Sequence, residues 1–480
     1  MIGVKAFGIY LPYYYVKRET IYRSMGWFNP GLGTLALGEK AVANHDEDST
    51  TLAVAAGMDC LATVNSADIT SLFLASTTFP YKERANASIA ATALNLDSET
   101  RTAEFSGALK AGTAALISAV SEADDGYKLV AAADCRLGKA GGTLEALFGD
   151  AAAAFVIGDG DVLASCEGHY SLSFDFADNR RIDEDQFVRT WEERWIREEG
   201  YTNFIPKAVN GLLRKCGINL DNVAKVAFPP INARDHAAVA KMMGLDKQQI
   251  QDPLIASVGL CGAAHPLLMF ASALEDAKPG DNIVVVGYGS GCDALLFRVT
   301  DAITDLKERG KIAKSLNFRR EVVDYTKYLS FKGMLAKEAG IRGEEIAATS
   351  LSLTWREKDA VLRLAGGKCM ECGTPQFPRE SVCINPSCGA VNRMEDYVFS
   401  DKIGRLFTYT ADHLTYSEDP PALYGIVDFD GGGRYWFDIA DCTLESLSVN
   451  QPVQMTFRRK YKDKQRSLFG YFWKAMPFKY

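Results

Sequence analysis

The sequence lacks any uncharged apolar run of the ~18 residues that a transmembrane helix needs. Its start, Met1-Ile2-Gly3-Val4-Lys5, does not show the basic region and long apolar stretch of a secretory signal. The sequence also has no excess of positive charge, because its 53 Lys and Arg residues are outnumbered by 61 Asp and Glu residues, which gives a formal net charge of −8. We therefore expect a cytoplasmic protein that has neither a membrane nor a nucleic acid as its partner.

The chain does have the length and apolar content of a multidomain globular protein. Its 480 residues exceed one compact domain, and 47% of them are hydrophobic whereas 24% are charged. Eleven cysteines without a secretory signal predict a reducing compartment, in which thiols serve metal binding, chemistry or core packing.

Apolar strands alternate with helices along residues 1–300. Near-continuous apolar runs such as 72–76 and 128–133 are typical of sheets that are covered on both faces. The alternation has a similar pattern in 1–165 and 166–300, which favours an internally duplicated α/β fold. The charged segment 301–324 is then predicted to be a linker, followed by an amphipathic helix over 325–339 that docks on a neighbouring surface.

One segment, Glu104 to Val120, organises the first half. It begins with a short apolar strand and turns through Ser106-Gly107. The helix predicted after the turn carries small residues on nearly every face. A helix without a polar stripe is a buried helix, so we expect this one at the centre of the fold.

This segment resembles the nucleophile motif of the thiolase superfamily, above all its hydroxymethylglutaryl-CoA synthase and ketoacyl synthase III branches. The family motif reads roughly E-x-x-x-A-C-x-A-G-T-A-A, and here Glu104-Phe105-Ser106-Gly107-Ala108-Leu109-Lys110-Ala111-Gly112-Thr113-Ala114-Ala115 stands in its place. The resemblance implies a duplicated thiolase fold with α-β-α-β-α layers, an acyl-CoA substrate and a homodimer. The position of the family's nucleophilic cysteine is Leu109.

The other two catalytic positions of the synthase branch are also substituted. The family glutamate corresponds to Thr77 in Ser76-Thr77-Thr78-Phe79-Pro80-Tyr81, and the family histidine corresponds to Pro229 after the strand 226–228. Base, nucleophile and histidine are therefore all missing. A cysteine acyl-enzyme at the head of the buried helix is not available.

The loops that frame the family site are retained. The resemblance places Asp134 at a strand end that lines the site, and Gly262 and Ser290 in the tight loops that, with Leu109, would surround the CoA thioester. Tyr288 is a candidate acid in the same frame, because a buried phenol can hydrogen-bond an enolate oxygen or move a proton.

Three further residues have both a catalytic and a structural interpretation. Cys135 and Cys261 could each replace the nucleophile, but such thiols are more often small buried hydrophobes. His265 could be a base or could cap the helix that follows it. His236 is expected at a solvated helix start.

Two cysteine pairs, Cys369-x2-Cys372 and Cys383-x4-Cys388, predict a metal centre. Four thiolates at knuckle spacing, with a glycine after each pair, favour tetrahedral structural zinc. From residue 397 on, short alternating strands and the turn Asp430-Gly431-Gly432-Gly433 predict a small antiparallel barrel. A helix with a zinc ribbon over 325–395 and a barrel over 396–480 resemble the OB-fold companion domain of thiolase-like enzymes, here fused to its partner.

A basic cluster lies in the last strands of this barrel. Arg458, Arg459 and Lys460 begin it, and it extends to Arg466. Such a cluster could attract the phosphates of CoA, or it could be a solvated hairpin.

The resemblance implies an enzyme that makes or breaks a carbon–carbon bond beside a CoA thioester. Because the nucleophile is missing, aldol addition or retro-aldol cleavage through an enolate is one alternative, since neither needs an acyl-enzyme. A non-catalytic acyl-CoA-binding scaffold that partners a second, cysteine-bearing thiolase is the other.

Overall fold

The structure, a computed structural model, describes residues 1–122, 126–306, 308–343 and 350–478. The chain divides into two compact units. The first comprises Met1–Asn44, Asp48–Ala91 and Leu96–Lys332, and the second comprises His45–Glu47, Thr92–Asn95 and Gly333–Tyr480. Among the described residues, no helix has both the length and the apolar character needed to cross a membrane.

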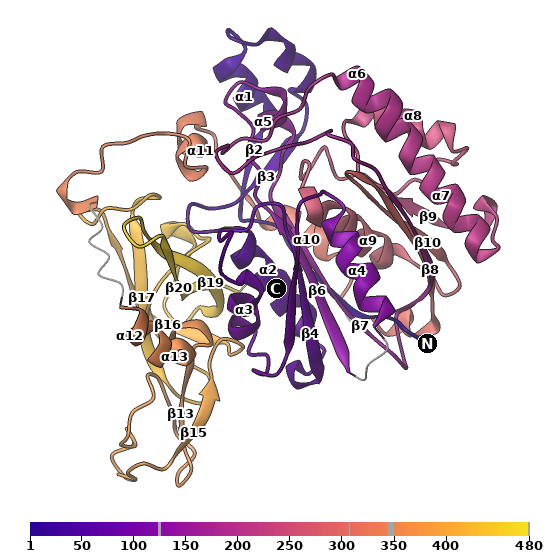
Figure 1. Ribbon diagram of the computed structural model, residues 1–480. Coiled ribbons are helices and arrows are strands. Elements are labelled where there is room, and N and C mark those ends of the chain that lie inside the picture. The colour runs from indigo at the N-terminus through magenta and orange to yellow at the C-terminus, as the bar shows by residue number, and fades with distance from the viewer. Residues whose placement is uncertain (123–125, 307, 344–349, 479–480) are drawn as a thin grey trace. The chain divides into compact units, whose positions relative to one another are not determined.

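The strands and helices up to Lys332 alternate as the sequence predicts (Figure 1). The strands are β1 (Gly3–Tyr10), β2 (Tyr14–Lys17), β3 (Glu39–Val42), β4 (Ile69–Ala75), β5 (Arg101–Phe105), β6 (Tyr127–Asp134), β7 (Ala151–Gly158), β8 (Ala164–Ser173), β9 (Lys225–Ala227), β10 (Asn282–Tyr288), β11 (Gly291–Val299) and β12 (Arg320–Glu321). The main helices are α1 (Arg18–Met25), α2 (Ser49–Leu61), α3 (Asn86–Ala93), α4 (Ala111–Ser121), α5 (Thr143–Leu147), α6 (Glu193–Trp195), α7 (Thr202–Cys216), α8 (Ala233–Met242), α9 (His265–Asp276), α10 (Lys311–Phe318) and α11 (Tyr325–Phe331).

Nine strands of the first unit form a sheet in the order β5-β4-β6-β7-β1-β8-β11-β10-β9. The junction between β1 and β8 consists of only two paired positions, Gly3 with Ser165 and Val4 with Ala164, so the sheet is two half-sheets. In each half, a parallel pair is followed by two antiparallel pairs. In one half β6 is parallel to β4, and β6–β7 and β7–β1 are antiparallel; in the other β10 is parallel to β9, and β10–β11 and β11–β8 are antiparallel. This repeated pairing is the duplication that the sequence predicts.

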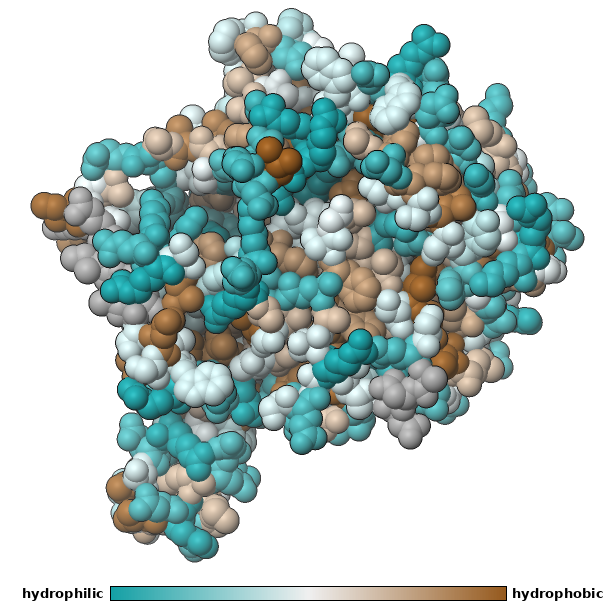
Figure 2. All heavy atoms as spheres, viewed as in Figure 1, coloured by the Kyte–Doolittle hydropathy of each residue, from teal (hydrophilic) through white to brown (hydrophobic). Residues whose placement is uncertain are grey.

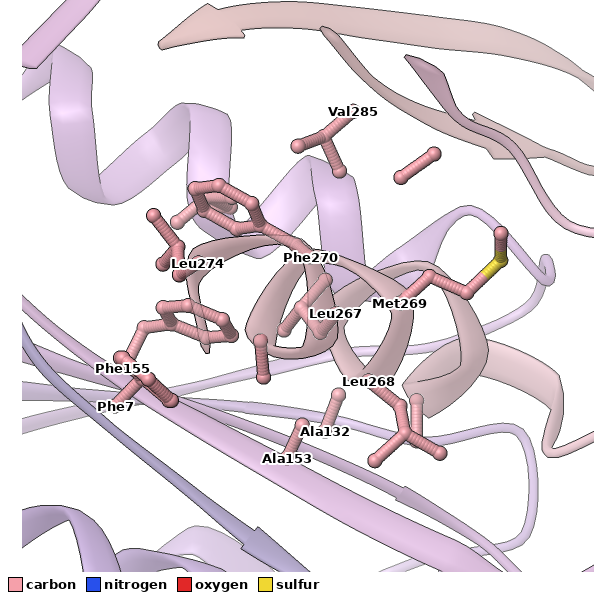
Figure 3. Packing of buried hydrophobic residues seen from close by; sticks show 14 of the residues in the cluster. Phe7, Ala132, Ala153, Phe155, Leu267, Leu268, Met269, Phe270, Leu274 and Val285 are labelled. Carbon is pink, nitrogen blue, oxygen red and sulfur yellow. The ribbon is translucent and has the colours of Figure 1, made fainter. Parts of the chain in front are cut away.

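Helices α4 and α9 lie between the two half-sheets. Phe270 of α9 stacks on Phe155 of β7 at 5.0 Å and contacts Phe297 of β11 at 4.6 Å between ring centroids. Figure 3 shows the side chains of α9 surrounded by strand residues of this core. Helix α2 covers the outer face of the first half-sheet, and α7 covers that of the second. The layers are therefore α-β-α-β-α, as predicted.

The small residues of α4 allow this close packing. A Cβ on Gly112 would lie 2.3 Å from the carbonyl oxygen of Ala263, so no side chain fits there. The buried residues of α4 are distributed around the helix, with Ala111, Thr113, Ala115 and Leu116 among them. The small side chains along α4 thus reflect burial of this helix on more than one side.

The second unit contains a small ribbon and a five-stranded barrel. Its elements are α12 (Leu351–Arg356), α13 (Lys358–Leu362), β13 (Ala365–Cys369), β14 (Pro375–Gln376), β15 (Met394–Val398), β16 (Gly404–Asp412), β17 (Ala422–Phe429), β18 (Arg434–Asp438), β19 (Pro452–Asp463) and β20 (Leu468–Pro477). The barrel order is β18-β17-β16-β19-β20, and a bridge between Ile439 and Ala475 closes it. The predicted turn between β17 and β18 has three glycines, Gly431 to Gly433, at positive φ.

The structure differs from the sequence expectation around residues 301–331. The segment expected to be a linker contains α10 and β12, and β12 pairs with β2 in the first unit. Ile312 of α10 belongs to the central core, which explains why this charged stretch is folded. The helix expected over 325–339 ends at Phe331, before Gly333 at φ +64°, and α11 packs in the first unit.

Candidate functional site

The head of α4 meets a tight loop after β10. A Cβ on Gly289 would lie 2.8 Å from the backbone nitrogen of Leu109, so the two segments touch through their main chains. The loop is held in unusual conformations, with Gly289 at φ +152°, Ser290 at φ +48° and Gly291 at φ +123°. Positive φ at a non-glycine residue such as Ser290 is concentrated at functional sites. Leu109 and Ser290 thus lie in one place, as the resemblance implies.

Asp134 is fully buried and accepts five hydrogen bonds. Its Oδ1 accepts from Ser76 Oγ at 2.8 Å, from the Thr77 backbone at 2.7 Å and from Thr78 Oγ1 at 3.0 Å. Its Oδ2 accepts from Thr77 Oγ1 at 3.0 Å and from the Ala263 backbone at 2.7 Å. Asp134 therefore fastens the loop after β4 to the turn before α9, and its lone pairs are committed to that role.

Gly262 is required beside this carboxylate. It adopts φ +57°, and a Cβ there would lie 2.1 Å from Asp134 Oδ2. The loop of Gly262 is thus shaped by Asp134, and a side chain at this position would displace the carboxylate.

Cys261 and His265 form a buried pair with a structural arrangement. His265 Nδ1 accepts from the Cys261 backbone at 3.2 Å, so Nε2 carries the proton and donates to the Pro253 carbonyl at 2.9 Å. Burial lowers the pKa of His265 to about 4 and raises the pKa of the Cys261 thiol well above its usual range. A neutral imidazole with both nitrogens engaged and a buried protonated thiol are poor catalytic groups.

Cys135 is the more accessible of the two candidate thiols. It follows Asp134 at the end of β6 and is partly buried, and its backbone nitrogen donates to Thr78 Oγ1 at 2.9 Å. It thus lies on the same loop cluster as Thr77, beside the Asp134 carboxylate.

Tyr288 lies on the face of β10 that points away from α4. A Cβ on the preceding Gly287 would meet Thr113 of α4, and side chains alternate along a strand. The ring of Tyr288 is 3% exposed and packs edge-on against Tyr201, with centroids 5.3 Å apart. Tyr201 in turn donates to the carbonyl of Pro229 at 2.9 Å, the residue predicted to stand at the position of the family histidine.

The buried carboxyl of Asp178 is the charged group that acts most on the Tyr288 phenol. Burial raises the pKa of the Tyr288 phenol, and the Asp178 charge raises it further. Burial also raises the pKa of Asp178, although hydrogen bonds and the charge of Arg136 oppose the shift. Among the described residues, Tyr288 Oη and Asp178 Oδ2 are buried side-chain oxygens without a hydrogen-bond partner.

Arg136 connects these groups to the Asp134 loop. It follows Cys135, its guanidinium lies 4.0 Å from the centroid of the Phe148 ring, and its Nη2 donates to Asn179 Oδ1 at 3.1 Å. Burial lowers its pKa to about 10, and the charges of Asp134 and Asp178 oppose that shift. Arg136 is thus a buried cation between two buried carboxylates.

A second buried ion pair anchors the head of α4. Lys110 Nζ lies 3.0 Å from Asp293 Oδ1 of β11, and Thr113 Oγ1 donates to Asp293 Oδ2 at 3.1 Å. This pair fixes the residue next to Leu109 to the second half-sheet.

His236 differs from its predicted solvated position. It is buried on the Phe228 ring, with centroids 4.0 Å apart, and its Nε2 lies 3.2 Å from the Phe228 carbonyl. Burial lowers its pKa to about 4. The reason is that α8 turns its first residues inward, onto the end of β9.

Of the basic residues proposed to bind phosphate, Arg458 is only 1% exposed. Its guanidinium pairs with Asp46, Glu47 and Asp441 in the second unit. Its charge is thus already balanced by buried carboxylates, and it is not available to a phosphate.

Arg459 and Lys460 also have partners in the second unit. Arg459 donates to the carbonyl of His45, and Lys460 Nζ lies 2.5 Å from Asp438 Oδ2. Of the three basic residues Arg458, Arg459 and Lys460, Lys460 is the exposed one.

The four predicted metal ligands lie together. The Sγ atoms of Cys369, Cys372, Cys383 and Cys388 are all within 4.8 Å of one another, and the closest pairs are 3.5 and 3.8 Å apart. Tetrahedral Zn–S bonds of about 2.3 Å place sulfurs roughly 3.8 Å apart, so the geometry fits a zinc ion without an open position.

The ribbon has little hydrophobic core of its own. Its buried cluster consists of Cys369, Cys383 and Met394, while Met370, Val382, Ile384 and Val391 are exposed. In Figure 2, hydrophobic residues are visible at the tip where Figure 1 places the loops beyond β13 and β15. A fold this small that leaves its larger apolar side chains exposed needs a metal to hold it.

Neither Asp178 nor Arg136 belongs to a motif that the sequence analysis recognised. Arg136 directly follows the two predicted site residues Asp134 and Cys135, so the sequence alone could have suggested it as a site residue. Asp178 lies in an irregular segment without a motif, and only the fold brings it to Tyr288.

Three families match parts of the chain. The C-terminal part of 3-oxoacyl-[acyl-carrier-protein] synthase III matches residues 213–299. The rubredoxin-like zinc ribbon domain of ChsH2 matches residues 356–391, and the C-terminal OB-fold domain of ChsH2 matches residues 397–458. The ribbon and barrel predicted from the sequence are thereby confirmed.

Relatives that match about 70% of the chain are named hydroxymethylglutaryl-CoA synthases. That of Methanopyrus kandleri is 31% identical over 343 residues, which cover 70% of this chain and 98% of the relative. That of Archaeoglobus fulgidus is 31% identical over 344 residues, which cover 69% and 98%. A hydroxymethylglutaryl-CoA synthase structure complexed with CoA has a TM-score of 0.61 at 18% identity and covers 72% of this chain and 95% of that one. The synthase III structure from Aquifex aeolicus has a TM-score of 0.54 at 19% identity and covers 62% and 100%.

Proposed function

Because this chain belongs to the hydroxymethylglutaryl-CoA synthase family, followed by a zinc ribbon and an OB-fold domain of the ChsH2 type, we propose that it acts on an acyl-CoA. The reaction makes or breaks the carbon–carbon bond beside the thioester, and it does so as an aldol addition or a retro-aldol cleavage, without a cysteine acyl-enzyme. The active form is a homodimer in this proposal.

The single observation that carries this proposal is Leu109 at the head of α4, inside a retained frame. The main chain of Gly289 still touches it, and the strained Ser290 loop is still present. The apolar Leu109 side chain cannot attack a thioester, and the nearby Cys261 thiol is buried and protonated. A site that keeps its frame but not its nucleophile is suited to chemistry that needs only enolate stabilisation and proton transfer.

The cleavage step balances without any co-reactant. The substrate is a 3-hydroxyacyl-CoA, whose hydroxyl loses its proton as the C=O bond forms and the Cα–Cβ bond breaks. The electron pair of that bond passes into the thioester enolate, and the enolate carbon then takes up a proton. The products are a shorter acyl-CoA and an aldehyde or ketone, and addition is the reverse.

Tyr288 is the proton-moving residue in this proposal. A raised pKa keeps the phenol protonated at neutral pH, so it acts as an acid or in exchange with a second group. Zinc has a structural role, because four thiolates leave no position for substrate.

Product analysis tests the proposal. The purified chain is incubated separately with saturated acyl-CoAs and with 3-hydroxyacyl-CoAs of the same carbon number, and thioesters are followed by liquid chromatography–mass spectrometry. We expect the 3-hydroxyacyl-CoAs alone to be shortened. Shortening of 3-oxoacyl-CoAs in the presence of free CoA would instead indicate thiolase chemistry. Tight thioester binding without any turnover would favour a scaffold for a second thiolase.

A further inference from the structure

We infer that Lys40 is a protonation-controlled latch: as a neutral amine it fastens α11 to segment 145–150 behind the candidate site, and as an ammonium it loosens that helix. The inference goes beyond the proposed function and does not depend on it. It assigns a role to a buried basic residue that the proposed chemistry does not use.

Lys40 of β3 is 3% exposed and lies in a buried cluster that joins α11 to segment 145–150. The aromatic rings of α11 pack with Val42 and Ala146 in one hydrophobic cluster (Figure 1). Polar contacts are embedded in this packing at three points, and each ties α11 or the residue after it to β3 or to segment 145–150. They are Tyr328 Oη with Lys40 Nζ at 3.1 Å, Tyr325 Oη with Glu145 Oε1 at 2.9 Å, and Lys332 Nζ with Asp150 Oδ2 at 2.7 Å.

The Lys40 amine has neutral partners. Its Nζ donates to the backbone carbonyl of Glu145, and the Tyr328 hydroxyl lies 3.1 Å away. Within the part of the chain that the structure describes, this nitrogen forms no ion pair with a carboxylate. A buried ammonium without such a partner is costly, whereas a neutral amine with these two partners is satisfied.

The two carboxylates of the cluster are held by other donors. Glu145 accepts from the Tyr325 hydroxyl and, at 2.7 Å, from the Gly141 backbone. Asp150 is paired with Lys332. A second ammonium on β3 would therefore have neither carboxylate as a direct partner.

The direction of one hydrogen bond makes the cluster sensitive to a single proton. A neutral amine has a lone pair, so Lys40 can accept the Tyr328 proton while it donates to the Glu145 carbonyl. An ammonium has no lone pair, so Tyr328 must then turn its proton away. The Tyr328 hydroxyl has no other hydrogen-bond partner among the described residues. Buried donors are rarely left without an acceptor, and protonation of Lys40 therefore weakens this contact.

The surroundings place this protonation near neutral pH. The pKa of Lys40 is lowered to about 7, chiefly by burial and then by the charge of Lys332, whereas Asp150 and Glu145 oppose the shift. The charge of Arg18 adds a smaller effect in the same direction as that of Lys332. The other titratable groups of the cluster keep their protons near neutral pH because burial raises their pKa values; they are Tyr325, Tyr328 and Cys261.

Segment 145–150 connects the latch to the candidate site. The Gly149 backbone donates to the carbonyl of Leu260 at 3.1 Å. A Cβ on Gly149 would lie 1.9 Å from the carbonyl oxygen of Val258, so the two main chains are in direct contact. This second chain continues into the turn of Gly262 beside Asp134. A movement of segment 145–150 therefore shifts the turn that lines the site.

Linkage determines the sign of the pH effect. When α11 is undocked, the Lys40 amine reaches water and regains its ordinary pKa of 10.5. Between pH 7 and pH 10.5 only this open form carries the proton, so each rise of one pH unit favours the closed form about tenfold. Below pH 7 both forms are protonated, and the latch is then at its weakest and no longer depends on pH.

Hydrogen exchange of the full chain, followed by mass spectrometry, tests the latch. Labelling times at pH 6–9 are scaled to the intrinsic exchange rate, and opening of residues 325–331 and 141–150 is measured in wild type, Lys40→Met and Lys40→Arg. We expect the wild-type opening constant to be level up to pH 7 and then to fall about tenfold per pH unit. Both variants should be level throughout, because neither side chain exchanges a proton in this range, and Lys40→Arg should be the more open.

The matched control is Lys17→Met, which removes an exposed lysine from the neighbouring strand β2 and should keep the wild-type slope. Opening of α7 should not follow this pH profile in any of the proteins.

Three results would overturn the inference. They are a wild-type α11 whose opening does not change between pH 7 and pH 9, a slope that persists in Lys40→Met, and a Lys40→Arg protein no more open than Lys40→Met. If Lys40→Arg does not fold, the comparison of wild type with Lys40→Met still decides. No turnover is measured, so the result is independent of the proposed function.

Discussion

The hydroxyl of Thr77 donates to the carboxylate of Asp134, with Thr77 Oγ1 3.0 Å from Oδ2. Thr77, which we predict to stand at the position of the family glutamate, is thus part of a buried hydrogen-bond cluster. A glutamate in its place would bring a second negative charge against Asp134, at a cost that a low-dielectric interior makes large. Thr77 instead satisfies this carboxylate with both its hydroxyl and its backbone nitrogen.

Asp134→Asn should destabilise the first unit. The amide keeps one acceptor oxygen but presents donors to Thr77 or to the Ala263 backbone, which then have no acceptor. Unsatisfied buried donors cost about 1–3 kcal/mol each, so we expect a loss of roughly 2–4 kcal/mol. Thermal and urea unfolding of the full chain measure it. The exposed Asp161→Asn is the control, and an Asp134→Asn variant as stable as that control would contradict the assigned role.

Acidification should destabilise the fold through His265 and His236. Both have pKa values lowered to about 4 by burial, against 6.5 in the unfolded chain. Between pH 6.5 and 4 only the unfolded chain takes up these protons, so stability is complete above pH 6.5 and falls toward pH 4. The loss at pH 5 is about 2 kcal/mol for each histidine. Urea unfolding at pH 7 and pH 5 measures it, and His265→Gln should reduce the difference whereas the exposed His413→Gln should not.

The ribbon should contain one zinc per chain. Elemental analysis of freshly purified protein should give one equivalent, and Cys372→Ser should lose most of it and loosen the second unit, because the ribbon has almost no core without metal. Cys216→Ser, on α7 of the first unit, is the matched control and should keep the zinc. Less than half an equivalent in wild type would count against a structural zinc.

Arg458→Ala should be far more harmful than Lys460→Ala. Removing the buried guanidinium leaves Asp46, Glu47 and Asp441 without their cation, which typically costs about 3–5 kcal/mol. The exposed pair of Lys460 with Asp438 is worth at most about 1 kcal/mol. Thermal unfolding of the two variants side by side measures this, and similar melting temperatures would refute the assignment.

Patterns that depend on local sequence predicted the fold well. The small residues of α4 correctly indicated that this helix is buried, because Gly112 has no room for a side chain. The spacing within the two cysteine pairs correctly predicted a cluster of four thiols, because the geometry of a zinc knuckle is set by a few neighbouring residues. The cluster consists of Cys369, Cys372, Cys383 and Cys388. The family comparisons confirm the duplicated fold, the ribbon and the barrel.

Features that depend on long-range packing were not predictable. Arg458 reads as a solvent-facing cation until residues 45–47 supply its carboxylates from the other end of the sequence. The outward orientation of Tyr288 follows from strand alternation, but its neighbour Asp178 follows from the path of an irregular segment. Residues 301–324 read as a linker because isolated buried side chains such as Ile303, Ile312 and Val322 are a weak signal among many charges.

The central claim is turnover without an acyl-enzyme, and intact-protein mass spectrometry after an acid quench tests it most directly. The full chain is mixed with the 3-hydroxyacyl-CoA that it cleaves and quenched during steady-state turnover. The account predicts an unchanged protein mass alongside shortened acyl-CoA, turnover that survives iodoacetamide, and a rate that falls about 10²–10⁴-fold in Tyr288→Phe. An acyl group carried by Cys135 or Cys261 during turnover would contradict it.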